Sequence, residues 1–191
     1  MVWTREFLTH RFNLDHPLDP VRLALTMRLV REFGVLEGST SSSRSRHPTP
    51  SWSGSTSRRT WRPCERRRKK GDDFAHGLGT DDNPIFEGLH EASCLVCGGS
   101  RLAAREIAEG RADRAVNIAG GRHHAMPNRA SGLCVYNDCA VAISWLLDHG
   151  VDRIADVDVD VHHGDGVQAA FYTPDVLPGG RPAAASTTPG C

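Results

Sequence analysis

Apolar residues recur at helical spacing in three segments of the chain. In residues 21–33 an apolar side chain stands at every fourth position, after an Asp-Pro pair that is typical of a helix start. Residues 88–110 and 137–149 show the same periodicity, and Asn137 is suited to cap the second of these. The sequence therefore predicts three helices, and the first should present one apolar face made of Val21, Leu25, Leu29 and Phe33, widened by Leu23, Met27 and Val30.

Short apolar runs between these helices predict strands. They are residues 2–4, 115–119 and 153–161, and a further helix should begin near Val167. Strands that alternate with helices are typical of βαβ units, in which helices cover both faces of a parallel sheet. The pattern thus predicts the α/β class, with residues 153–161 as a buried strand.

Residues 38–70 differ from the rest in composition. They are rich in Ser, Thr, Arg and Pro, and they hold ten of the chain's 23 lysines and arginines beside a single acid, Glu65. Such a segment buries too little apolar surface to offset its conformational entropy, so we expect disorder. It is either a nucleic-acid-binding arm with stacking residues Trp52 and Trp61, or an aberrant segment with no evolved role, and we favour the second interpretation.

Overall composition excludes several classes of protein. The formal net charge is zero, which indicates no polyanionic partner, and no stretch is apolar and long enough for a membrane span. We expect no secretory signal in the first residues, MVWTREFLTH, because they include no apolar core region. The six cysteines form no disulfide framework, so we expect reduced thiols and a cytoplasmic location. Cys94 and Cys97 fit helix positions better than a zinc ribbon, because no second pair is present.

Two loops after predicted strands carry site chemistry. They are Gly120–Ala125 (GGRHHA) and Asp158–Gly166 (DVDVHHGDG). The carboxyl ends of parallel strands meet at one edge of a sheet, where sites form. Acids at alternate positions 156, 158 and 160 would repel one another on one strand face unless a divalent cation or cationic histidines were present. Asp-x-His suits zinc or ferrous iron, and Gly164 and Gly166 should let the backbone turn sharply there. Each motif alone is commonly a surface pair, but the two together are hard to explain as packing.

Four runs resemble the histone deacetylase superfamily, and most closely its bacterial acetoin-utilisation type. They are GGRHHAMPNRASGLCVYND (residues 120–138), DVDVHHGDG (158–166), HPLDPVRLALTMRL (16–29) and GLGTDDNPIFEGLHEAS (77–93). The resemblance covers residues 1–37 and 71–177. It implies a three-layer αβα fold with a mainly parallel sheet, the arginase/deacetylase fold. It also implies zinc-dependent hydrolysis of the amide of acetyl-lysine, or of a related acyl-amine, by metal-activated water.

The resemblance also implies roles for individual residues at the reaction centre. Asp160 and His162 resemble two metal ligands, for zinc or ferrous iron. His124 resembles the general base, and His123 its neighbour near the leaving amine. Asp158 and Asp165 resemble the carboxylates behind His123 and His124 respectively, and a potassium ion is also implied near Asp158.

Other matched positions concern the substrate and the product. Gly132 and Leu133 resemble the wall of the acyl-lysine tunnel, and Asp81 or Asp82 the acid at its rim. Arg22 resembles the arginine of an internal channel for acetate release. The implied partner is an acetylated lysine on a protein or a small acyl-amine. A membrane is not expected, nucleic acid is disfavoured, and substrate identity and oligomeric state stay open.

The sequence departs from the family pattern in three ways. The third metal aspartate and the tyrosine of the family have no counterpart, because Asp175 and Tyr172 lie too close to the HHGDG block. Asp156 stands where an aromatic residue is usual. We therefore expect a partial domain at residues 1–177, interrupted by 38–70 and incomplete at its C-terminus, and a disordered tail at 178–191. The insert and the tail both resemble out-of-frame translation.

These departures predict weak zinc binding and little deacetylase activity. A second hypothesis is a non-catalytic deacetylase-like binding protein with a nucleic-acid-binding basic arm. A third, an arginase-type metallohydrolase, is disfavoured by the doubled histidines.

Overall fold

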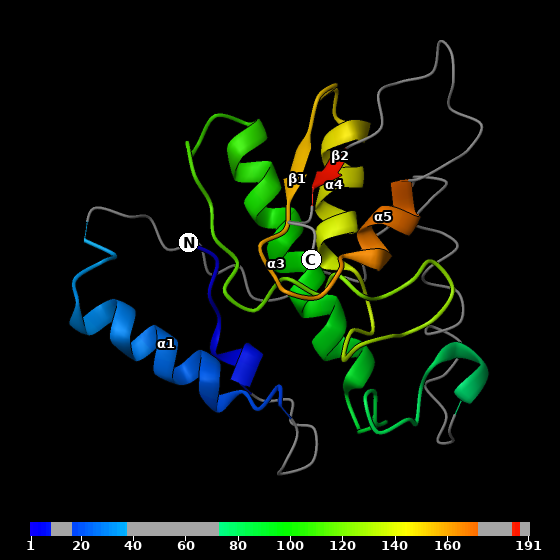
Figure 1. Ribbon diagram of the computed structural model, residues 1–191. Helices are drawn as coiled ribbons and strands as arrows, with labels where there is room; N and C mark the ends of the chain where they lie inside the picture. The colour runs from blue at the N-terminus through cyan, green and yellow to red at the C-terminus, as the bar shows by residue number, and fades with distance from the viewer. Residues whose placement is uncertain (9–16, 38–72, 172–184, 188–191) are drawn as a thin grey trace.

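The computed structural model describes residues 1–8, 17–37, 73–171 and 185–187. In these residues the chain forms η1 (Arg5–Leu8), α1 (Val21–Glu32), η2 (Phe74–His76), α3 (Leu89–Ala108), α4 (Asp138–Asp148), β1 (Ala155–Val157), α5 (Asp165–Phe171) and β2 (Ala185–Thr187). Helices α3 and α4 make the most extensive contact between elements, and Figure 1 shows α1 set apart from them on the side of the N-terminus.

Helix α3 is buried at its middle, where a glycine lets a neighbouring segment approach. Gly98 and Gly99 are buried, and a Cβ atom on Gly99 would lie 2.9 Å from Nδ2 of Asn117. The Asn117 amide instead donates to the carbonyl of Val96 at 3.0 Å. The predicted helix is confirmed. Glycine weakens an isolated helix, but Gly99 allows close packing here.

Helix α4 also begins where the sequence predicts. The Oδ1 atom of Asn137 accepts a hydrogen bond from the N–H of Ala140 at 2.9 Å, as an N-cap does. Two clusters form the core on either side of α3. One contains Leu78, Cys97, Ala130, Val135, Tyr136 and Val141, and the other contains Trp3, Phe7, Met27 and Ala119.

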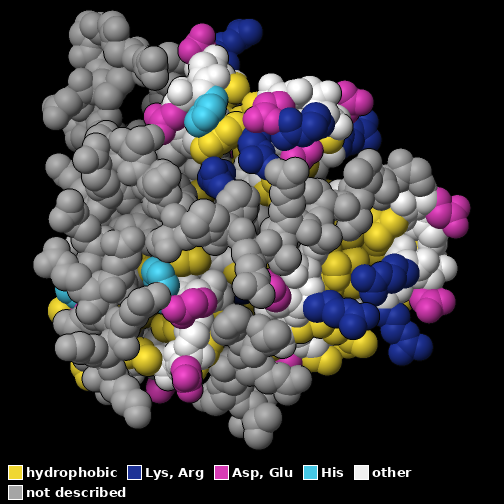
Figure 2. All heavy atoms as spheres, turned by 180° about the vertical axis from the view of Figure 1, so that it is seen from behind, with side chains coloured by type: hydrophobic (Ala, Val, Ile, Leu, Met, Phe, Trp, Pro, Cys, Tyr) yellow, Lys and Arg dark blue, Asp and Glu magenta, His cyan; other side chains and the backbone are white. Residues whose placement is uncertain are grey.

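Helix α1 forms as predicted, but only part of its predicted apolar face is buried. The buried residue of α1 is Met27, with Leu23 packed beside it. The four apolar residues spaced four apart are exposed, at 49% for Val21, 54% for Leu25, 56% for Leu29 and 77% for Phe33. Figure 2 shows hydrophobic side chains among arginines on the side of the molecule where α1 lies. The repeat lies along one side of a helix that is apolar on two sides. The other side, with Leu23 and Met27, packs into the core.

The strands are shorter than the predicted ones. Residues 2–4 and 115–119 contribute one isolated parallel bridge, between Val2 and Asn117, and residues 153–161 contribute only the three residues of β1. The predicted burial of this segment is wrong, because its valines 157, 159 and 161 are exposed at 68%, 86% and 76%. Strand β1 pairs in parallel with β2, with Ala155 opposite Ala185, in a segment for which no strand was predicted.

Several predictions fall outside the described residues. These are the disorder of residues 38–70, the positions of Tyr172 and Asp175, and the tail except for β2. Within the described ranges, none of the helices has the length and apolar character that a membrane crossing requires.

Candidate active site

Two adjacent histidines, each paired with a carboxylate, form the centre of the candidate site. Nδ1 of His123 lies 2.5 Å from Oδ2 of Asp158, and Nδ1 of His124 lies 2.8 Å from Oδ1 of Asp165. The two imidazole centroids are 4.1 Å apart. The acids come from the loop after β1 and from the first residue of α5, so the tertiary structure joins the two loops that the sequence singled out.

Glycines make room for this arrangement by close approach. Gly132 has a φ of 51°, and a Cβ atom there would lie 2.5 Å from Cδ2 of His124. A Cβ atom on Gly166 would lie 2.4 Å from the carbonyl oxygen of Ala125, and one on Gly164 would lie 2.7 Å from Oδ2 of Asp158. Neither Gly164 nor Gly166 has a positive φ, and Gly166 lies in the first turn of α5. These two glycines are needed because there is no space for a side chain.

The Asp158 carboxylate is set up to stay ionised. Burial by itself raises its pKa, but hydrogen bonds from the His123 ring and the Asp160 amide outweigh burial and lower the pKa below its usual value. The Asp160 N–H donates to Oδ1 of Asp158 at 3.0 Å, so both carboxylate oxygens are used. An ionised Asp158 favours the tautomer of a neutral imidazole in which the proton sits on the nitrogen that faces the carboxylate.

The predicted metal ligands Asp160 and His162 lie beside the histidine pair. The His162 ring centroid is 5.9 Å from that of His124. Nδ1 of His162 lies 2.8 Å from Oδ1 of Asp160, and both side chains are exposed, at 72% and 50%. The amide of His162 also donates to Asp160, which lowers the pKa of that carboxyl.

These two donors do not amount to a zinc site by themselves. Catalytic zinc uses three protein ligands and an open position. Among the described residues no group of three histidine, cysteine, aspartate or glutamate side chains converges on one point. The donor types suit zinc or ferrous iron, but the set in the described part of the chain is incomplete.

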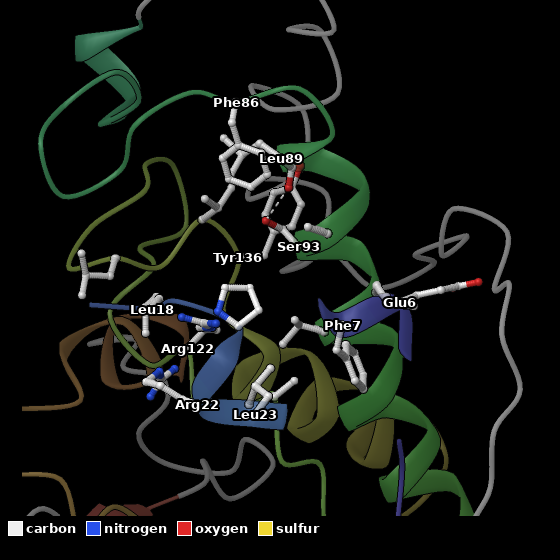
Figure 3. A pocket seen from close by; sticks show the side chains of 17 residues that line it. Glu6, Phe7, Leu18, Arg22, Leu23, Phe86, Leu89, Ser93, Arg122 and Tyr136 are labelled. Atoms are coloured by element: carbon white, nitrogen blue, oxygen red, sulfur yellow. Dashed lines mark hydrogen bonds between the residues drawn. The ribbon is translucent and has the colours of Figure 1, made fainter. Parts of the chain in front are cut away.

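We call residues Gly120–Ala125 the histidine loop, and a cavity of ≈ 70 Å³ adjoins this loop at Arg122 (Figure 3). Arg22 from α1, Arg122 and Leu133 line it, together with Tyr136. Burial lowers the pKa of the Arg122 guanidinium, and the nearby Arg22 lowers it further. The sequence assigned no role to Arg122, although its place directly before His123 was a signal that it would lie near the site.

The other predicted substrate residues are spread around the site. Gly132 and Leu133 are the two central residues of a tight turn between Ser131 and Cys134, with φ values of 51° and 65°. This turn sets Gly132 against His124 and Leu133 into the cavity. Asp81 and Asp82 are exposed in the loop before α3 and do not line the cavity.

Known proteins are similar to this chain over the region that contains the candidate site. A family model described as histone deacetylase domain matches residues 16–178. The chain is 50% identical over 103 residues to acetoin utilization protein AcuC of Bacillus subtilis, covering 53% of this chain and 27% of that protein. It is 34% identical to AcuC of Staphylococcus xylosus over 91% of this chain and 46% of that protein.

A solved structure also matches. The crystal structure of an HDAC homolog from Aquifex aeolicus superimposes with a TM-score of 0.72 at 30% identity, over 91% of this chain and 48% of that one. This confirms the predicted arginase/deacetylase fold. The chain spans about half the length, or less, of these relatives. With its two histidine–aspartate pairs in the matched region, the chain belongs to the histone deacetylase domain family and, within it, to the acetoin-utilisation type.

Proposed function

We propose that this chain carries the proton-handling part of a deacetylase site, which hydrolyses the amide of acetyl-lysine or of a related acyl-amine. The observation that carries the proposal is the pair of neighbouring imidazoles, each with Nδ1 at a carboxylate. Amide hydrolysis requires a base that takes a proton from water and an acid that returns one to the leaving amine. Two adjacent rings with Nε2 available suit these two tasks.

The two histidines differ in their surroundings, which suggests a division of roles. His123 is only 8% exposed, and its partner Asp158 is largely buried as well. The His124 side chain is 20% exposed and faces the ring of His162. We assign His124 as the general base, because its side chain is more exposed than that of His123 and its ring faces His162, a candidate metal ligand. His123 is its neighbour on the leaving-amine side.

Zinc, with ferrous iron as the alternative, is proposed only for a site completed by a third donor beyond the described pair. A potassium ion near Asp158 is likewise proposed, on the family resemblance alone. The Gly132–Leu133 turn is proposed as the wall of the acyl-lysine tunnel, Asp81 or Asp82 as its rim, and Arg22 as part of the acetate channel.

The incomplete donor set also favours a second candidate, a deacetylase-like protein that binds without turning over. Here the chain would bind an acetylated peptide and release it unchanged. The proposed nucleic-acid-binding arm, residues 38–70, lies outside the described residues. Binding to random DNA that weakens steeply with added salt is the signature of such an arm, because a polybasic segment displaces many counterions from the phosphates.

The test is a deacetylase assay on an acetyl-lysine peptide with the purified chain and added zinc. We expect slow turnover at most, abolished by His124→Ala. A matched control is His163→Ala, because the Nε2 atom of His163 bonds to Oε1 of Gln168 at 2.6 Å. Turnover that survives His124→Ala would refute the assignment. Peptide binding with no turnover in any variant would support the second candidate.

A further inference from the structure

Two residues at the start of helix α4 form hydrogen bonds with the backbone of the histidine loop. Asn137 and Asp138 are 3% and 1% exposed. Nδ2 of Asn137 donates to the carbonyl of His123 at 3.1 Å and to that of Ala125 at 3.2 Å, the two carbonyls that flank His124. One side-chain amide thus fixes the backbone on both sides of the proposed general base.

The Asp138 carboxylate holds the residues just before the histidines. Its Oδ1 accepts the N–H of Arg122 at 2.7 Å, and its Oδ2 accepts the N–H of Gly121 at 3.2 Å. The hydroxyl of Ser100 on α3 donates to the same Oδ2 at 2.5 Å. A buried carboxylate is costly unless it is hydrogen-bonded, and here two of its three donors come from the loop.

Steric fit points the same way. A Cβ atom on Gly120 would lie 2.5 Å from Oδ2 of Asp138, so the loop sits directly on the carboxylate. Helix capping alone does not explain this pattern. Asn137 and Asp138 make six side-chain hydrogen bonds with the described residues, and of these only the one from Ala140 to Oδ1 of Asn137 serves the helix. Four of the other five go to the loop backbone, and one goes to Ser100.

We propose that Asn137 and Asp138 are positioning residues, which fix the histidine loop so that His123 and His124 meet Asp158 and Asp165. The catalytic meaning of this inference rests on the proposed function, but its geometry does not. Catalytic side chains must be held to within about 0.5 Å of their working position, and a loop needs buried hydrogen bonds to reach that precision.

The experiment separates loop positioning from helix capping. Serine is also a good N-cap, so Asn137→Ser keeps the bond to Ala140 but loses both donors to the loop. Asn137→Ala loses both functions. The readout is the ¹H–¹⁵N correlation spectrum of the imidazoles at fixed pH, which reports whether Nδ1 of each histidine keeps its hydrogen-bonded proton. Circular dichroism reports whether helix content changes.

We expect Asn137→Ser to keep its helix content while the Nδ1–H signals of His123 and His124 shift or are lost. As a second measurement, Asp138→Asn should speed exchange of the Gly121 and Arg122 amides about tenfold or more, because hydrogen bonds to a charged acceptor are lost. Ser100→Ala leaves the bonds from the loop amides to Asp138 in place and should change exchange at these two amides much less.

Unchanged imidazole signals in Asn137→Ser, or equal amide exchange in Asp138→Asn and the wild-type chain, would overturn the inference. Failure of the proposed function would appear separately, as turnover that does not depend on His124. The imidazole spectra and exchange rates require no turnover, so the two failures are distinguishable.

Discussion

Replacing Gly132 by alanine should destabilise the chain more than its backbone conformation alone explains. Gly132 has a φ of 51°, a left-handed conformation that costs a residue with a Cβ atom about 1–2 kcal/mol. The new Cβ would also lie 2.5 Å from Cδ2 and 2.7 Å from Cγ of His124. Overpacking of this kind costs about 1–3 kcal/mol more, so we expect a total of about 2–5 kcal/mol.

The matched control is Gly150→Ala. Gly150 has a φ of 85°, but a Cβ atom there would meet nothing within 4 Å. Its replacement should therefore cost only the conformational part, about 1–2 kcal/mol. The difference between the two variants isolates the contact with His124.

Urea and thermal unfolding of both variants, followed by circular dichroism, measure this difference. For a chain of this length 1 kcal/mol moves Tm by about 2–4 °C, so Gly132→Ala should melt about 2–12 °C below Gly150→Ala. Equal destabilisation of the two variants would show that His124 does not lie against Gly132, and the described geometry of the site would then be wrong.

Three further predictions concern the core, the thiols and the metal. Met27→Ala should lower the free energy of unfolding by about 2–5 kcal/mol, whereas Leu29→Ala, at a position 56% exposed, should change it by about 0.5 kcal/mol or less. Comparable losses in urea unfolding would mean that the exposed side of α1 is buried in solution. Burial raises the pKa of the Cys97 thiol well above its usual value, so the contribution of this thiol to the free energy of unfolding is complete below the unfolded thiol pKa of about 8.5 and is lost as pH rises towards the folded pKa. The decline of Tm from pH 7 to 10 should therefore be shallower in Cys97→Ala, and an identical slope would contradict this. Zinc at about 100 µM should raise the free energy of unfolding very little, and a gain of about 2.7 kcal/mol would reveal a Kd near 1 µM and a complete ligand set.

Local patterns predicted the helices better than the strands. Helices α3 and α4 begin and end within a residue or two of their sequence signals, because capping and periodicity are properties of one segment. A strand requires a partner, and among the described residues the apolar run at 115–119 forms only one bridge, at Asn117. The unpredicted β2 exists because β1 pairs with it, which no pattern within residues 185–187 could show.

By itself, the sequence determined the family and the main helices and predicted the candidate site residues, since these depend on residue type and spacing. Only the tertiary structure decided which stripe of α1 is buried, because α1 has two apolar stripes and the choice depends on what packs against it. It also decided that Arg122 enters a cavity and that Asn137 and Asp138 hold the histidine loop. Hydrogen bonds between residues more than ten positions apart depend on how helices and loops meet in space, and no local spacing encodes that meeting.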